Sequence, residues 1–172
     1  MEYELLIREA EVEDAAELVS FLNRVSVETD FTSLDRNGIL MTDTEMELFL
    51  DKQAHSENQI TLLALLNDEI AGIVNITADQ RKRVRHIGDI FIVIGKRYWN
   101  NGLGSFLLEE AIEWAQASGI LRRLQLTVQT RNQAAVHLYQ KHGFITEGRQ
   151  ERGAYIEEGK FIDVYLMGKL ID

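Results

Sequence analysis

The chain has 172 residues, of which 45% are hydrophobic and 27% are charged, and these values fit one globular domain over residues 1–172. The formal net charge of −10 argues against nonspecific nucleic-acid binding, which needs a basic surface. The absence of cysteine excludes disulfides, a cysteine nucleophile and thiolate metal sites.

The first residues and the apolar segments bear on localisation. The acidic start, Met1-Glu2-Tyr3-Glu4, lacks the basic region and the apolar stretch of a signal peptide. No apolar segment approaches the roughly 20 residues that a membrane-spanning helix needs. We therefore expect a cytoplasmic protein.

The N-terminal part predicts one strand and two helices. Residues 3–8 form a short apolar-rich segment typical of a strand. Residues 12–25 place five apolar side chains on one helical face: Val12, Ala15, Ala16, Val19 and Leu22. The polar segment 30–40 contains the turn pair Asn37-Gly38 and is expected to be a loop. A second helix is predicted over 42–54, with Thr42 or Thr44 as its cap.

Three strands follow in the middle of the chain. The segments 60–66 and 70–76 predict two strands, and the short link between them predicts a hairpin. The next connection, 77–85, contains the one dense basic run of the sequence, Arg81-Lys82-Arg83-Val84-Arg85. Residues 87–94 are almost wholly apolar and predict a central strand buried on both faces.

The C-terminal half alternates helices and strands. A helix is predicted over 103–117, and its apolar side is Leu103, Phe106, Leu107, Ala111, Trp114 and Ala115. A strand over 124–128, a short helix from Asn132 to Lys141 and strands over 144–148 and 161–169 complete the chain. This order predicts a mixed sheet with helices packed on it.

The turn between the strand 87–94 and the helix 103–117 contains Gly102 and Gly104. Glycine lets the backbone approach a ligand closely, and a helix N-terminus presents unpaired N–H groups. Together they favour an anion site for a phosphate or pyrophosphate. The turn lacks the third glycine of a dinucleotide fingerprint and the Gly-Lys-Ser/Thr of a Walker loop. Taken alone, Gly-x-Gly fits a structural turn equally well.

A second set of residues lies in the segment 127–144. Asn132 and Tyr139 are seven positions apart, so they lie two turns apart on one helical face, and Gly143-Phe144 follows. Taken alone, these residues fit a helix cap and a core aromatic.

In combination, the two segments resemble the GCN5-related N-acetyltransferase (GNAT) superfamily, whose members move an acetyl group from acetyl-coenzyme A to an amine. The family's pyrophosphate motif, Arg/Gln-x-x-Gly-x-Gly/Ala, corresponds to residues 99–104. Its later motif corresponds to Asn132, Tyr139, Gly143 and Phe144. This chain departs from the pattern at Trp99, where the family carries Arg or Gln, and Arg97 is a candidate replacement for that charge.

The resemblance implies an α/β fold of the α+β type, with a mixed, mostly antiparallel sheet of about seven strands flanked by about four helices. It also implies a V-shaped splay between the fourth and fifth strands. The implied activity is direct acetyl transfer to a primary amine of a small molecule or a peptide, with acetyl-CoA as cosubstrate and no metal.

The resemblance also implies a set of site residues. Tyr139 would be the general acid beside the sulfur, and the strand backbone at 92–94 would pair with the pantetheine arm. The implied cofactor-binding residues are Ile92, Val93, Ile94, Arg97, Asn100, Asn101, Gly102, Leu103, Gly104, Ser105, Asn132 and Tyr139.

The general base has several candidates. Asp89 interrupts an apolar strand, where a charge is costly unless it is used or paired, and it aligns roughly with an acid of the relatives. His86 is a second candidate. Glu28 and Asp30 are further candidates and would also bind a cationic acceptor. The basic run at 81–85 fits a solvated loop, or a contact with the 3′-phosphate of coenzyme A or with an acidic partner.

A function of another class stays open on the sequence alone, namely a noncatalytic acyl-CoA-binding or sensory module. A homodimer is a further expectation, since edge strands near the C-terminus need cover. The sequence predicts neither a nucleic-acid nor a membrane partner.

Overall fold

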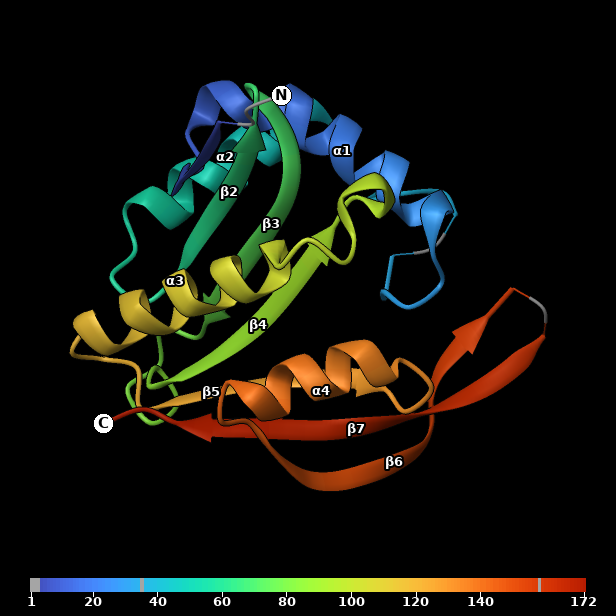
Figure 1. Cartoon of the computed structure of the whole chain (residues 1–172). Helices are drawn as coiled ribbons and strands as arrows, with labels where there is room; N and C mark the ends of the chain where they lie inside the picture. Colours follow the sequence, from blue (N-terminus) through green and yellow to red (C-terminus); the bar gives the residue numbers. More distant parts are fainter. Residues whose placement is uncertain (1–3, 35, 158) are drawn as a thin grey trace.

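The computed structural model of the chain describes residues 4–34, 36–157 and 159–172. Its strands form one sheet in the order β1-β2-β3-β4-β5-β7-β6 (Figure 1). The strands are β1 (Leu5–Glu9), β2 (Ile60–Leu66), β3 (Glu69–Ala78), β4 (Ile87–Ile94), β5 (Arg123–Gln129), β6 (Ile145–Ile156) and β7 (Lys160–Leu170). The helices are α1 (Ala15–Glu28), α2 (Asp43–Ala54), α3 (Leu103–Ala117) and α4 (Gln133–Lys141), with short 3-10 turns η1 (Val12–Asp14) and η2 (Lys96–Tyr98).

The pair β4–β5 divides the sheet into two halves. Of the described strand pairs it is the one parallel pair, and all other neighbouring strands are antiparallel. Pairing between β4 and β5 is confined to Ile87–Asp89 against Arg123–Gln125. Beyond those residues the two strands diverge, as Figure 1 shows between the green and the orange halves of the chain. The mixed sheet and the predicted splay between the fourth and fifth strands are therefore confirmed.

Two helices pack on each face of the sheet. On one face, α1 and α2 pack through a core that includes Leu18, Phe21 and Leu50. On the other face, α3 and α4 share a core with both halves of the sheet, including Leu107 and Tyr139. Within the described ranges, no helix is both long and apolar enough to cross a lipid bilayer.

Several predicted elements match the structure closely. The strands 60–66 and 87–94 and the helix 103–117 have the predicted bounds. Thr42 caps α2 as expected, since its side chain accepts a hydrogen bond from the Glu45 N–H. Of the strand predicted over 3–8, Tyr3 lies outside the described residues.

Three predictions about burial and extent are wrong. The strand β4 is not buried on both faces: only Gly88, Ile90 and Val93 are buried, because the strand borders an open cavity. On α3, Phe106 is 52% exposed, and Leu108 packs in the core instead. The strand predicted over 144–148 extends to Ile156, although its pairing with β7 is irregular after Gln150.

The basic run lies far from the glycine turn. It follows β3 and precedes β4, whereas the glycine turn follows the other end of β4, a strand of 8 residues. Such a strand spans roughly 26 Å. The run is therefore at the wrong end of the sheet to contact a ligand bound at the turn.

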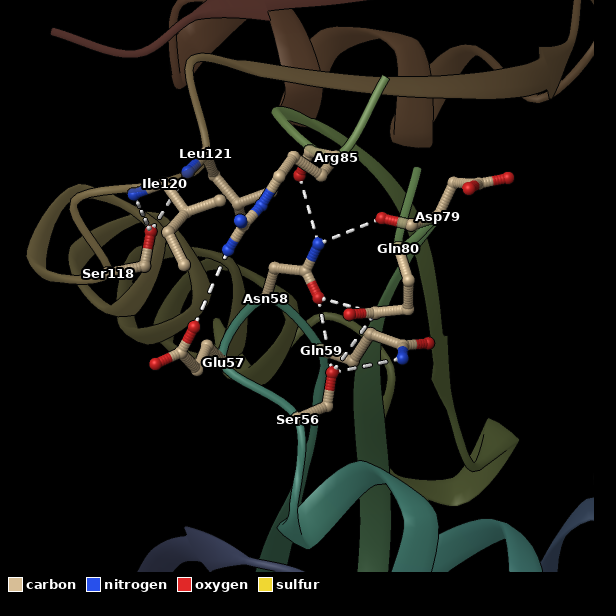
Figure 2. Close-up of polar contacts among 10 residues, drawn as sticks. All are labelled: Ser56, Glu57, Asn58, Gln59, Asp79, Gln80, Arg85, Ser118, Ile120 and Leu121. Atoms are coloured by element: carbon tan, nitrogen blue, oxygen red, sulfur yellow. Dashed lines mark hydrogen bonds and ion pairs between the residues drawn. The ribbon is translucent and has the colours of Figure 1, made fainter. Parts of the chain in front are cut away.

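Asn58 fixes this basic connection to the body of the protein (Figure 2). Its side chain is 1% exposed and makes four hydrogen bonds. The Nδ2 group donates to the Asp79 carbonyl at 3.1 Å and to the Arg85 carbonyl at 2.9 Å. The Oδ1 atom accepts from Ser56 Oγ at 3.1 Å and from Gln80 Nε2 at 2.9 Å. One buried amide thus holds both ends of the connection.

We expect Asn58→Ala to lower the free energy of unfolding by about 2–3 kcal/mol, because it removes a buried amide and the hydrogen bonds that it donates to two part-buried carbonyls. Urea denaturation followed by circular dichroism measures this change. The control is Glu57→Gln, which alters an exposed side chain with one 3.4 Å contact to Arg85. Equal stabilities for the two variants would contradict the assigned role of Asn58.

Candidate active site

A cavity of about 720 Å³ opens where β4 and β5 diverge. Its walls come from β4, the turn after it, the first turn of α3, the end of β5, and α4. Of the residues predicted to bind the cofactor, ten line it: Ile92, Val93, Ile94, Asn100, Gly102, Leu103, Gly104, Ser105, Asn132 and Tyr139. The structure therefore brings the two sequence motifs to one cavity.

The start of α3 has the features of an anion site. Gly102 precedes the helix with φ +76°, a left-handed conformation that favours glycine. Among the described residues no side chain caps this helix, and its first turn contains no acidic residue. The unpaired N–H groups of the first turn therefore remain available to a ligand, and the helix dipole favours an anion there.

Side chains of the turn hold its shape. Trp99, at the position where the family carries Arg or Gln, donates its indole N–H to the Ile94 carbonyl at 2.9 Å. The Asn101 amide donates to the Tyr98 and Trp99 carbonyls at 3.2 and 3.0 Å. Trp99 lines the cavity, whereas Asn101 does not. Both residues thus contribute to the site by stabilising the backbone of the turn.

Tyr139 lies in the wall formed by α4. Asn132 begins this helix and accepts a hydrogen bond from the Ala135 N–H at 3.3 Å. Tyr139 is 7% exposed and packs edge-on against Phe144, with ring centroids 5.8 Å apart. Burial raises the pKa of Tyr139 above its usual range, so the phenol keeps its proton at neutral pH. Within the described structure its hydroxyl has no hydrogen-bond partner, which leaves the proton free for a ligand.

Other predicted residues lie outside the cavity. The guanidinium of Arg97 stacks on the Tyr98 ring, 5.0 Å from its centroid. Asp89 is exposed and accepts a hydrogen bond from Gln125 Nε2 at 2.9 Å, so the expected cost of a buried charge does not arise there. His86 precedes β4 and lines neither cavity described here.

A second cavity of about 430 Å³ adjoins the first. The two share five lining residues: Thr29, Thr32, Ser33, Gly153 and Ala154. The α1–α2 loop and the β6–β7 hairpin form its walls. Glu28 and Asp30, the predicted acceptor-binding residues, line this cavity.

Arg131 fixes the loop between the two cavities, a role that the sequence reading missed. Its Nη2 lies 2.6 Å from Asp30 Oδ1, and its Nε donates to Gln129 at 2.8 Å. The guanidinium also stacks on Phe31 at 4.9 Å. The buried Gln129 donates to the Asp30 carbonyl at 2.7 Å. The one signal for this contact in the sequence is a polar run after a strand. No local pattern indicates the contact itself, because Asp30 and Arg131 are 101 positions apart.

The acidic groups gather on one side of the site. The described lining of the larger cavity includes no Asp or Glu, and its titratable members are Tyr98, His137, Tyr139 and Lys141. The smaller cavity is lined by Glu28, Asp30 and Glu157. Asp30 is paired with Arg131, and Glu157 lies 4.0 Å from Arg36. Glu28 accepts the Lys96 backbone N–H at 3.0 Å and has no ion-pair partner in the described part of the chain.

No group of three or more His, Asp or Glu side chains among the described residues is arranged to hold a metal ion. The polar groups at the site therefore consist of backbone N–H groups, hydroxyls, amides and single charged side chains.

Two curated relatives are similar to part of the chain. The L-amino acid N-acetyltransferase AaaT of Escherichia coli (strain K12) is 32% identical over 109 residues, which is 63% of this chain and 67% of that protein. The spermidine N(1)-acetyltransferase of the same strain is 27% identical over 104 residues, which is 60% of this chain and 55% of that protein. The chain thus spans between about half and two thirds of the length of these relatives.

Solved structures match almost the whole chain. The crystal structure of an acetyltransferase of the GNAT family from Streptococcus pneumoniae is 86% identical, with a TM-score of 0.96, and covers 98% of this chain and 100% of that chain. The structure of yncA from Salmonella typhimurium with acetyl-CoA is 18% identical and shares the fold, with a TM-score of 0.85 and coverage of 98% and 95%. The sequence model of the acetyltransferase (GNAT) family matches residues 19–144. The chain belongs to the acetyltransferase (GNAT) family.

Proposed function

We propose that the chain transfers the acetyl group of acetyl-CoA to a primary amine by direct transfer in a ternary complex. The observation that carries this proposal is the cavity between β4 and β5, which joins an uncapped helix N-terminus to a buried, protonated tyrosine. The absence of cysteine excludes a cysteinyl acyl-enzyme and favours direct transfer. A single continuous domain over residues 1–172 remains part of the proposal.

The larger cavity fits acetyl-CoA, which supplies the acetyl group as a thioester. The first turn of α3 would hold the pyrophosphate through its backbone N–H groups. Along β4, Ile90–Ile94 has no strand partner on the β5 side, so its backbone can pair with an extended ligand. Asn132 lines the same cavity and would contact the pantetheine arm.

Tyr139 is the proposed general acid. Its hydroxyl is protonated at neutral pH, as a phenol ordinarily is, and burial raises the pKa further. The side chain lines the cavity and makes no competing hydrogen bond in the described structure. When the amine nitrogen bonds to the acetyl carbon and the C–S bond of the thioester breaks, the proton of Tyr139 can pass to the departing thiolate of coenzyme A.

The smaller cavity is the proposed acceptor site. An amine with a pKa near that of lysine, about 10.4, arrives mostly protonated and must lose a proton before it attacks. Among the candidate bases, Glu28 best combines position and availability, since it lines this cavity and has no cationic partner in the described part of the chain. It can attract the ammonium group and accept its proton, directly or through water. Asp30 instead supports the loop, because Arg131 neutralises it.

We expect acetyl-CoA-dependent thiol release with one class of primary amines. The panel contains free amino acids, polyamines, aminoglycosides, and peptides with free N-termini or lysines, since the relatives' names include an L-amino acid and a spermidine acetyltransferase. Calorimetric binding of acetyl-CoA without release on any amine would instead favour a noncatalytic acyl-CoA module. An acetylated chain, detected by mass spectrometry after incubation with acetyl-CoA alone, would refute direct transfer.

We expect Tyr139→Phe to lower kcat about 100-fold, the smaller end of general acid catalysis. The dissociation constant of acetyl-CoA, measured by calorimetry, should stay within about twofold, because the ring and its packing on Phe144 remain. Tyr98→Phe is the matched control, since Tyr98 also lines the cavity and its ring still supports Arg97. Full turnover in Tyr139→Phe would remove the assigned role.

We expect Arg131→Ala to raise the KM of the best acceptor about five- to tenfold, because the loop that carries Asp30 and Phe31 loses an ion pair and a stacking contact. The affinity for acetyl-CoA should change little. Arg83→Ala is the control, since Arg83 is exposed on the distant basic connection. If the two variants have the same acceptor KM, Arg131 does not position the acceptor loop.

A homodimer stays a prediction. The edge strand β6 carries charged residues, including Arg149 and Glu151, and its pairing with β7 is irregular. Both features protect a sheet edge from pairing with a further strand. A dimer would therefore use a face of the protein other than this edge.

A further inference from the structure

One stripe of α4 faces the larger cavity. Ala134, His137, Leu138 and Lys141 all line it, and their spacing of three, four and seven positions places them on one side of the helix. Two of these four side chains can carry positive charge. Both His137 and Lys141 are exposed, so they reach the cavity at its mouth.

This stripe lies against the first turn of α3. A Cβ atom at Gly104 would be 3.3 Å from Leu138 Cδ2, so the two helices touch there. In addition, Ser105 Oγ lies 2.8 Å from His142 Nε2, the residue that caps the C-terminal end of α4. The mouth therefore has the N–H groups of α3 on one side and the side chains of His137 and Lys141 on the other.

The charges of α4 are free to bind a ligand. Neither His137 nor Lys141 has an ion-pair partner among the described residues, whereas Arg8, Arg123, Arg131 and Arg149 are each paired with a carboxylate. Lys141 lies in the last turn of α4, where the helix dipole favours a cation. A chain of net charge −10 repels a ligand with several phosphates, so binding of such a ligand needs local cations that offset this repulsion.

Coenzyme A carries two separate phosphate groups, the pyrophosphate and the 3′-phosphate of its ribose. The first turn of α3 accounts for the pyrophosphate, and the basic connection at 81–85 is excluded by its place at the far end of β4. We propose that Lys141, assisted by His137 one turn before it, binds the 3′-phosphate and so selects coenzyme A over its 3′-dephospho form. This inference rests on the proposed binding of acetyl-CoA in the larger cavity.

The test is calorimetric titration of the full chain with coenzyme A and with 3′-dephospho-coenzyme A. The wild-type chain is expected to bind coenzyme A about tenfold more tightly than the dephospho form. Lys141→Gln should weaken coenzyme A about fivefold and leave the affinity for the dephospho form unchanged. The matched control, Lys82→Gln, removes the same charge from the exposed basic connection and should change neither affinity.

Each other outcome of the titrations identifies which part of the inference is wrong. Equal affinities of the wild-type chain for the two ligands would overturn the inference and leave acetyl-CoA binding intact. An equal weakening of both ligands by Lys141→Gln would overturn the assignment of Lys141 to the 3′-phosphate. A loss of preference in Lys82→Gln would move the contact to the basic connection. Binding of neither ligand by the wild-type chain would overturn the proposed function itself.

Discussion

The structure depends on the point at which β4 and β5 separate. Their parallel pairing lasts only over Ile87–Asp89, and Gly88 lies at the junction. A Cβ atom there would be 2.9 Å from Ile76 Cγ2 and 3.0 Å from Leu124 Cδ2, so a side chain at this position would crowd the core beside the junction. Beyond the junction, backbone groups of β4 that a continuous sheet would pair are left to a ligand or to water. Residues of β4 beyond the junction are only partly buried, so water can hydrogen-bond to these groups and an extended ligand can replace that water.

The separation also organises the helices and the charges. Both α3 and α4 follow strands that border the opening, and their contact at Gly104 and Leu138 closes one side of it. On the other side, the α1–α2 loop is tied to the end of β5 by Arg131. As a result, backbone donors and cations gather at one mouth, whereas the carboxylates lie in the adjoining cavity. This division suits an anionic cosubstrate entering from one side and a cationic amine entering from the other.

Local sequence patterns predicted the elements that depend on local physics. The bounds of α3 follow from Gly102 before Leu103 and from its apolar spacing, and the Thr42 cap follows from its capping box. The bent strand β6 was predicted too short, since it is rich in charge and its apolar alternation is broken. The burial of β4 was overestimated because its composition is that of a core strand, while the separation from β5 is a property of the whole sheet.

The candidate site also has a part that local sequence patterns predict and a part that they do not. The two motifs predicted the turn at Gly102 and the wall at Tyr139, since each motif is contiguous in the sequence. The exposure of Asp89 does not follow from the sequence, because the apolar composition of β4 predicts burial while the separation from β5 leaves part of the strand open. Arg131 and Gln129 were missed because their partners on the α1–α2 loop are about a hundred positions away, and no local pattern encodes that contact.

Trp99 shows how the site tolerates its departure from the family pattern. A side-chain cation at this position would add one contact to a phosphate, but the backbone donors of α3 depend only on the shape of the turn. The indole N–H holds that shape by bonding to the last carbonyl of β4, and Asn101 bonds to two further carbonyls. A charge missing from the turn can then be supplied from another element that reaches the same mouth, and α4 is the element that carries cations there. The hydrogen bonds of Trp99 and Asn101 thus hold the shape of the turn without a side-chain cation at position 99.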